Sequence, residues 1–250
     1  MPARKKTTKA PGDGMTAKQR KRRKPISEEY MLPVEPLTHN QKLFFDEWEK
    51  GQMIYAYGVA GTGKTFIALY KALKDVLNEY TPYEKIYIVR SLVATREIGF
   101  LPGDHEDKSS LYQIPYKNMV QSMFEMPDDA SYEMLYDNLK AQETVSFWST
   151  SFIRGTTLDN AIVIIDECQN LNFHELDSII TRVGQDSKII FCGDAAQTDL
   201  QKISERTGII DFQRILQNMD EFSLIEFGID DIVRSGLVKS YLINKINLGL

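Results

Sequence analysis

The residues with the clearest chemistry form the glycine-rich segment GVAGTGKT, which begins at Gly58. Glycine reaches backbone angles that a Cβ forbids, so Gly58, Gly61 and Gly63 can turn backbone N–H groups inward to cradle phosphates. Lys64 is spaced to reach the β- and γ-phosphates, and the hydroxyl of Thr65 is spaced to hold Mg²⁺. The alternative is a glycine turn that merely joins a strand to a helix. An apolar run precedes the segment and a helix-like stretch follows it, and this context favours a nucleotide site.

A second group with catalytic potential is a pair of acids at the end of an apolar run. Asp166 and Glu167 directly follow the run Ala161–Ile165. Asp166 can hold the water shell of Mg²⁺, and Glu167 can polarise an attacking water as a general base. The alternative is a strand whose acids cap the next helix. The phosphate loop in the same chain favours the catalytic interpretation.

Two glutamines are further candidates for contacts with a nucleotide. Gln197 follows an apolar run and the turn Gly193-Asp194. At the carboxyl edge of a sheet, its amide could hydrogen-bond the γ-phosphate or the attacking water. Gln41 opens a helix before the first strand, and its amide offers one donor and one acceptor that match the edge of adenine. Taken alone, Gln41 is more typical of an ordinary surface residue.

Strands that alternate with helices must position these residues. Most expected strands are continuous apolar runs, which is typical of a parallel sheet covered on both faces. The strands are expected at 53–57, 85–90, 144–148, 161–165, 188–192 and 223–227. The helices are expected at 40–50, 65–79, 114–124, 131–142, 173–183 and 209–219, with a loop at 99–108. The pattern predicts an α/β fold with a mostly parallel, doubly wound sheet.

Charge is unevenly distributed along the 250 residues, whose formal net charge is −5. Residues 1–25 contain ten Lys or Arg against Asp13 alone, a net +9, which leaves −14 for residues 26–250. The basic segment has few large apolar side chains, so we expect a disordered tail, assigned to residues 1–30. The run Lys18–Lys24 suits nucleic-acid phosphates and a plain solvated tail about equally, and a nuclear localisation signal is less favoured.

Composition also bears on location. No apolar run approaches the roughly 20 residues that a membrane-spanning helix needs. The charged N-terminus lacks the apolar segment of a secretory signal. We therefore expect a cytoplasmic protein with no membrane partner. Cys168 and Cys192, the only two cysteines, lie in or beside apolar runs and are expected to be reduced, packed thiols.

The order of these motifs resembles the PhoH family. The segments that carry the resemblance are Asn40-Gln41, GVAGTGKT, Val89-Arg90-Ser91, 99–104, 154–161, IIDECQN and GDAAQTDL. Members of this family are P-loop ATPases associated with phosphate starvation, with a core similar to the first motor domain of superfamily 1 helicases. The match extends over about residues 37–245, so residues 31–250 are assigned to one PhoH-like ATPase domain. The resemblance implies that this is a single RecA-like P-loop NTPase domain.

The resemblance implies further roles. The residue matching Gln41 recognises adenine, the segment around Arg90 matches a helicase nucleic-acid motif, and Arg154 belongs to an Arg-Gly element near the site. Arg234 matches an arginine finger, whose guanidinium would stabilise transition-state charge on the γ-phosphate. A surface cap or salt bridge is the alternative for Arg234. The family usually has alanine at the position of Cys168.

These considerations define a set of expected site residues. The expected catalytic residues are Lys64, Asp166, Glu167, Gln197 and Arg234. The expected nucleotide-binding residues are Gln41, Gly58, Val59, Ala60, Gly61, Thr62, Gly63, Lys64, Thr65 and Phe66. The expected metal ligands are Thr65 and Asp166, and the expected cofactors are ATP and Mg²⁺.

Two functions of different classes remain open. A helicase site lies between two motor domains, whereas this chain has one phosphate loop, so we expect Arg234 of a neighbouring subunit to complete the site. The resemblance implies a homo-oligomer, with a hexameric ring favoured. The first hypothesis is a Mg²⁺-dependent ATPase coupled to binding or unwinding of RNA or single-stranded DNA. The second is a slow ATP-dependent switch or adaptor that regulates a partner. A small-molecule kinase is a third, less favoured hypothesis.

Overall fold

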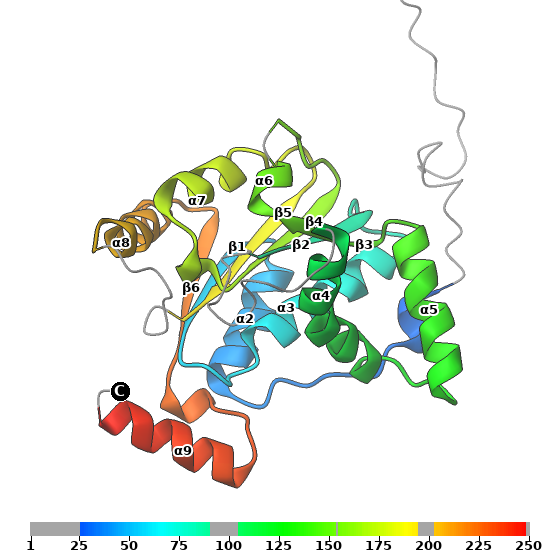
Figure 1. The fold of residues 1–250 in the computed structure, drawn as a ribbon, viewed down its shortest axis with the longest axis horizontal. Helices are drawn as coiled ribbons and strands as arrows, with labels where there is room; N and C mark the ends of the chain where they lie inside the picture. The colour runs from blue at the N-terminus through cyan, green and yellow to red at the C-terminus, as the bar shows by residue number, and fades with distance from the viewer. Residues whose placement is uncertain (1–25, 91–104, 154, 195–202, 249–250) are drawn as a thin grey trace, which may run out of the picture.

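The computed structural model describes residues 26–90, 105–153, 155–194 and 203–248 (Figure 1). Within these residues, six strands form one parallel sheet in the order β3-β2-β4-β5-β1-β6. The strands are β1 (Met53–Gly58), β2 (Lys85–Arg90), β3 (Val145–Ser149), β4 (Ala161–Asp166), β5 (Lys188–Gly193) and β6 (Phe222–Phe227). Each expected strand is found within one residue at either end, which confirms the predicted α/β fold.

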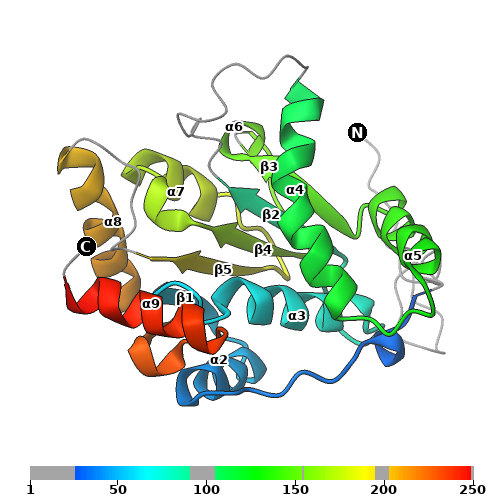
Figure 2. The ribbon, with the colours of Figure 1, turned by 60° about the horizontal axis from the view of Figure 1, so that its bottom comes forward.

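Helices cover both faces of the sheet (Figures 1 and 2). On one face pack α2 (His39–Glu49), α3 (Lys64–Leu77), α4 (His105–Ser122) and α5 (Asp129–Ala141). On the other pack α6 (Thr150–Ile153), α7 (Phe173–Ile180) and α8 (Ile203–Gln217). Because both faces are covered, every residue of the central strands β4 and β5 is buried. Their continuous apolar sequences follow from this burial.

Two helices, α4 and α8, begin more than five residues earlier than expected. We expected a helix from residue 114, after a loop at 99–108, but α4 already begins at His105; residues 99–104 lie outside the described residues. Pro115 favours a helix start at that point, because proline is best tolerated in the first turn, yet the helix here continues through it. Helix α8 begins at Ile203 rather than at residue 209.

The C-terminal helix α9 (Gly236–Asn247) was not predicted. It lies apart from the sheet (Figure 1), and none of its residues, all of which the structure describes, is buried. Helix α9 is therefore not one of the core-facing helices that cover the sheet. It is joined to β6 by the short 3₁₀ helix η3 (Ile229–Asp231).

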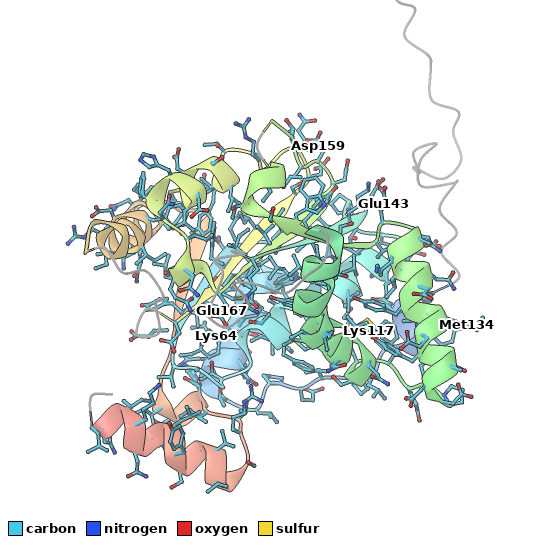
Figure 3. All side chains as sticks on the ribbon, in the orientation of Figure 1. Lys64, Lys117, Met134, Glu143, Asp159 and Glu167 are labelled. Carbon is cyan, nitrogen blue, oxygen red and sulfur yellow. The ribbon has the colours of Figure 1, made fainter. Side chains whose placement is uncertain are left out.

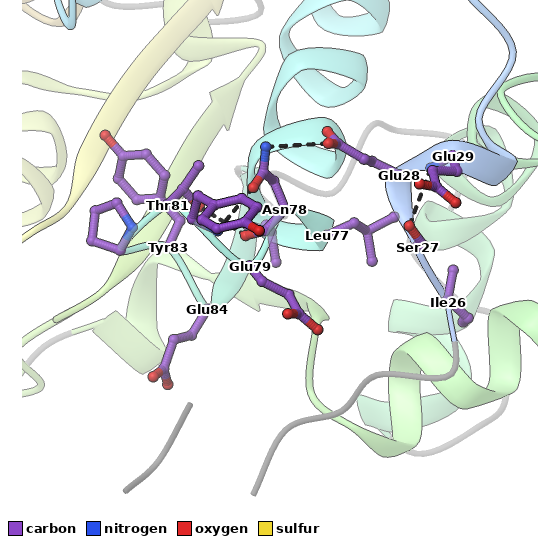
Figure 4. Close-up of a pocket in the computed structure, with 13 residues that line it drawn as sticks. Ile26, Ser27, Glu28, Glu29, Leu77, Asn78, Glu79, Thr81, Tyr83 and Glu84 are labelled. Carbon is purple, nitrogen blue, oxygen red and sulfur yellow. Dashed lines mark hydrogen bonds between the residues drawn. The ribbon is translucent and has the colours of Figure 1, made fainter. Parts of the chain in front are cut away.

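The described chain begins with residues that we had assigned to the basic tail. Ile26 is buried in the core beside α3, and Glu28 accepts a hydrogen bond from Asn78 Nδ2 at 3.2 Å. A pocket of about 260 Å³ lies between this segment and the connection from α3 to β2 (Figure 4). Residues 26–30 thus pack on the body of the domain because Ile26 buries its apolar side chain there, and the rest of the expected tail, residues 1–25, lies outside the described residues.

Candidate nucleotide site

The phosphate loop lies between the end of β1 and the first turn of α3. Gly58 has a φ of 115°, and a Cβ at this position would lie 2.2 Å from the carbonyl oxygen of Phe227. Gly61 has a φ of 78°. Both positions require glycine because of their backbone angle. Gly58 also requires it because β6 approaches so closely that a Cβ would not fit. The loop opens directly into α3 at Lys64, so the N-terminus of that helix faces the expected phosphate position.

Lys64 lies along the phosphate loop. Its Nζ donates to the carbonyl oxygens of Gly58 at 2.9 Å and Val59 at 2.7 Å, and to Thr62 Oγ1 at 3.2 Å. Burial lowers the pKa of Lys64, and nearby carboxylates, including that of Asp166, oppose this shift. All three ammonium protons are therefore held by oxygens of the loop.

Thr65 and Asp166 form the expected pair for a cation. Thr65 Oγ1 donates to Asp166 Oδ1 at 2.7 Å, and Asp166 is only 6% exposed. Because the hydroxyl proton points to the carboxylate, the lone pairs of Thr65 Oγ1 are available to a metal ion. Hydroxyl and carboxylate oxygens are the ligands that Mg²⁺ prefers, so the residues present fit this ion.

The second acid, Glu167, is held by a neighbour that we did not single out. Gln169 Nε2 donates to Glu167 Oε2 at 2.6 Å, and Gln169 Oε1 accepts from the backbone N–H of Asp194 at 2.9 Å. One buried amide thus joins the acid after β4 to the end of β5. Glu167 itself has a φ of 52°, an unusual backbone angle for a residue with a Cβ.

Two more residues, neither of them in the set of expected site residues, lie beside Asp166. Tyr116, on α4, donates its hydroxyl to Asp166 Oδ2 at 2.6 Å. Arg90 ends β2 directly opposite Asp166 in the sheet register. Burial alone would lower the pKa of Arg90, but the neighbouring Tyr116 hydroxyl and Asp166 carboxylate outweigh burial and raise it. Arg90 therefore stays a cation beside the carboxylate.

These residues surround one cavity of about 590 Å³. Its lining includes residues 60–65 of the phosphate loop, Asp166, Glu167, Arg90 and, from α4, Tyr116. Lys64 and Glu167 lie near each other in the view of Figure 3. The size is in the range of a small-molecule or cofactor site. Cys168 and Cys192 are both buried as free thiols, as expected.

Comparison with known proteins places the chain in a family. The model of the PhoH-like protein family matches residues 33–244. The chain belongs to the PhoH family. It is 32% identical over 210 residues to the PhoH-like protein of Bacillus subtilis, covering 80% of this chain and 60% of that protein. It is 31% identical over 212 residues to Protein PhoH of Escherichia coli, covering 84% of this chain and 57% of that protein.

The chain therefore spans a little over half the length of these PhoH relatives. Among solved structures, the large terminase of a thermophilic bacteriophage superposes with a TM-score of 0.52 at 14% identity, over 83% of this chain and 50% of the terminase. Another crystal form of that terminase, in complex with ADP, gives a TM-score of 0.50 at 15% identity over 82% and 49%. Likeness at this identity shows the shared fold.

None of the described helices has the length and hydropathy needed to cross a membrane.

Gln41, the residue expected to recognise adenine, lies beside the phosphate loop. It is 3% exposed, so its interpretation as an ordinary surface residue was wrong. Its Oε1 accepts from Leu37 N at 2.8 Å, and its Nε2 donates to Thr62 O at 2.9 Å. A primary amide has two protons and two acceptor positions, so one of each remains. Phe66, one residue into α3 from Thr65, also lines the cavity.

Arg234, the finger candidate, lies against the phosphate loop of its own chain. Val233 N donates to Gly61 O at 3.1 Å, and a Cβ on Gly61 would lie 3.0 Å from Arg234 Cγ. The Arg234 side chain lines the same cavity as Lys64. Two other expected residues, Gln197 and Arg154, lie outside the described residues. Their roles stay predictions.

Proposed function

We propose that this protein hydrolyses ATP with Mg²⁺ as cofactor. The observation that carries the proposal is the hydrogen bond between Thr65 and Asp166 in a cavity that Lys64 and Glu167 also line. A phosphate-binding lysine, a cation pair and a second acid are the parts that phosphoryl transfer to water requires. Membership of the PhoH family and the terminase-like fold support the proposal.

In this proposal each side chain has one task. Lys64 exchanges contacts with its own loop for contacts with the β- and γ-phosphates. Thr65 and Asp166 would hold Mg²⁺, which when bound would neutralise the negative charge that develops on the phosphates. Glu167 orients the attacking water and accepts its proton, and Gln169 keeps that carboxylate in place. Gln197 is proposed as a further contact to the γ-phosphate.

The base is proposed to be adenine. Gln41 is fixed by its bonds to Leu37 and Thr62 and retains one N–H and one acceptor position, which match N7 and the N6 amino group. A fixed amide also discriminates against guanine, whose O6 would face the amide oxygen. Gln41→Glu should therefore weaken ATP binding more than GTP binding.

Nucleic acid is proposed as the activator of hydrolysis. The basic run Lys18–Lys24 has the charge to contact phosphates, and those contacts would make binding weaken with salt. We propose single-stranded DNA or RNA as the form that is bound. Unwinding, if coupled, would require movement along the strand, which a strand-displacement assay measures.

A homo-oligomer is proposed from the C-terminal helix. Leu237 is 83% exposed and Tyr241 is 65% exposed on α9, which is unusual for large apolar side chains on one short helix. A second copy of the chain would cover them, and we favour a hexameric ring. Because Arg234 lines the cavity of its own chain, the proposed finger can act within one subunit or across the interface.

A mixing experiment separates these two arrangements. Lys64→Ala and Arg234→Ala subunits are each expected to be inactive, and they are mixed at several ratios. Recovery of ATPase activity would show that Arg234 acts on a neighbouring site. Inactivity at every ratio, with oligomers retained by sedimentation, would place Arg234 within its own site.

The decisive test of the proposed function is an ATPase assay with RNA, single-stranded DNA or neither. The controls are Lys64→Ala and Glu167→Gln, which should lose turnover, and a variant that lacks residues 1–25. Stimulation lost with the tail supports the nucleic-acid proposal. Slow turnover that nucleic acid leaves unchanged, together with an ATP-dependent change of oligomer size, would instead support a switch or adaptor. No ATP-specific turnover in the full chain would refute the proposal.

A further inference from the structure

The carboxylate of Asp166 is held from two sides by hydroxyl groups. Thr65 donates to Oδ1 at 2.7 Å, and Tyr116 donates to Oδ2 at 2.6 Å. Thr65 belongs to the phosphate loop region, whereas Tyr116 belongs to α4, in the helical insertion between β2 and β3. The orientation of the expected cation ligand therefore depends on a segment outside the phosphate loop and outside the acid pair.

The Tyr116 side chain is rigidly placed. It is 2% exposed, and its ring packs against Phe147 with 5.3 Å between ring centroids. A phenol is a proton donor at neutral pH, and the hydroxyl of Tyr116 gives its proton to Asp166 Oδ2. Arg90 supplies positive charge next to the same hydroxyl. A buried phenol that donates to a buried carboxylate makes a charge-assisted hydrogen bond, which is among the stronger kinds.

We propose that Tyr116 is a positioning residue for the cation site, which fixes Asp166 and ties α4 to occupancy of that site. The inference rests on the proposed Mg²⁺-nucleotide function. Partners of this outer kind orient metal ligands, and their loss typically weakens metal affinity by about 10- to 100-fold. Because the hydroxyl of Tyr116 donates to Asp166 and not to the phosphate loop, removal of that hydroxyl should spare binding of the nucleotide itself.

The test compares Tyr116→Phe with Tyr132→Phe. Both changes delete one buried tyrosine hydroxyl in the same part of the domain, since Tyr132 donates to the backbone oxygen of Lys117 on α4. Each variant is titrated with Mg²⁺ in the presence of N-methylanthraniloyl-ADP, and binding of the probe is followed by fluorescence. No turnover is needed for this readout.

We expect the Mg²⁺ midpoint of Tyr116→Phe to rise about tenfold, and that of Tyr132→Phe to stay within about twofold of the wild type. Affinity for the probe in EDTA should be the same for all three proteins. An unchanged midpoint for Tyr116→Phe would overturn the inference. A wild-type protein that binds no probe, or shows no Mg²⁺ dependence, would overturn the proposed function instead.

A second measurement uses the wild type alone and does not depend on folding of a variant. Amide hydrogen exchange of residues 113–122 on α4 is compared between ADP with Mg²⁺ and ADP with EDTA. If α4 is tied to the cation site through Tyr116, exchange should slow only when Mg²⁺ is present. Equal exchange in both conditions would overturn the tie between α4 and the cation site.

Discussion

Thr65 donates its hydroxyl proton to Asp166 Oδ1 over 2.7 Å and so joins the first turn of α3 to the end of β4. The two residues are 101 positions apart in the chain. Their contact follows from the parallel sheet, which brings the carboxyl ends of β1 and β4 to the same edge. A hydroxyl that gives its proton to a carboxylate keeps its lone pairs for a cation.

This relationship predicts different results for two substitutions of Thr65. Thr65→Val keeps the shape but removes the hydroxyl, so Mg²⁺-dependent ATP hydrolysis should fall by about 100-fold or more. Thr65→Ser keeps the donor and the lone pairs and should retain activity within about tenfold. Steady-state ATPase assays across a Mg²⁺ series measure both. Equal activity of the two variants would show that the hydroxyl does not serve the metal.

The bridge formed by Gln169 predicts a defect in turnover rather than in binding. Gln169→Leu removes the amide that donates to Glu167 and accepts from Asp194, at nearly constant volume. A misplaced general base should lower kcat by about 10- to 100-fold and leave KM for ATP within about threefold. Gln185→Leu, at an exposed position after α7, is the matched control. A rise in KM with normal kcat would argue against a role in holding Glu167.

The parts of this fold that could be predicted are those that local sequence determines. Burial on both faces makes β4 and β5 continuous apolar runs, and this pattern identified them directly. The phosphate loop is equally local, because its positive-φ glycines and its lysine are close together in sequence. The acid pair was recognised because it follows a buried strand.

The missed parts depend on contacts between distant segments. Tyr116 reaches Asp166 from a helix 50 residues earlier, and no spacing rule links a tyrosine of an insertion to a carboxylate on a strand. Gln169 lay inside a recognised motif, but only the positions of β4 and β5 show that its amide joins them. The placement of Arg234 on its own loop likewise depends on how η3 and α9 leave β6.

Substitution of Gly61 by alanine should have two effects, backbone strain and steric contact, and the same substitution at Gly51 separates them. Both Gly61 and Gly51 have positive φ, of 78° and 85°, so alanine at either should strain the backbone by about 1–2 kcal/mol. A Cβ at Gly51 meets nothing within 4 Å, whereas at Gly61 it meets Arg234 and Leu242 at 3.0 and 3.2 Å. Gly61→Ala should therefore also weaken nucleotide binding. The affinity for ADP, measured by calorimetry, should be normal for Gly51→Ala and lower for Gly61→Ala. Equal ADP affinities of the two variants would contradict this account.

Lys188 predicts a specific dependence of stability on pH. This residue, at the start of β5, is 3% exposed, and burial lowers its pKa from 10.5 to about 8. The unfolded chain therefore binds more protons than the folded one between these values, so stability contributed by Lys188 rises with pH in that window. Relative to Lys188→Met, the wild-type free energy of unfolding should rise by about 2 kcal/mol from about pH 8 to about pH 10. Urea unfolding of both proteins measures it, and parallel pH profiles would contradict the shift.

Removal of the Tyr136 hydroxyl should not lower the stability of the protein. Among the described residues, its buried hydroxyl is one of the few side-chain groups with no hydrogen-bond partner. An unsatisfied buried hydroxyl carries a desolvation cost, so Tyr136→Phe should leave stability unchanged or raise it by about 1 kcal/mol. Tyr132, a helical turn earlier on α5, donates to Lys117 O, and Tyr132→Phe should lower stability by about 1 kcal/mol instead. Thermal unfolding of the two variants compares them directly. A loss for Tyr136→Phe as large as that for Tyr132→Phe would mean that the Tyr136 hydroxyl has a partner in solution.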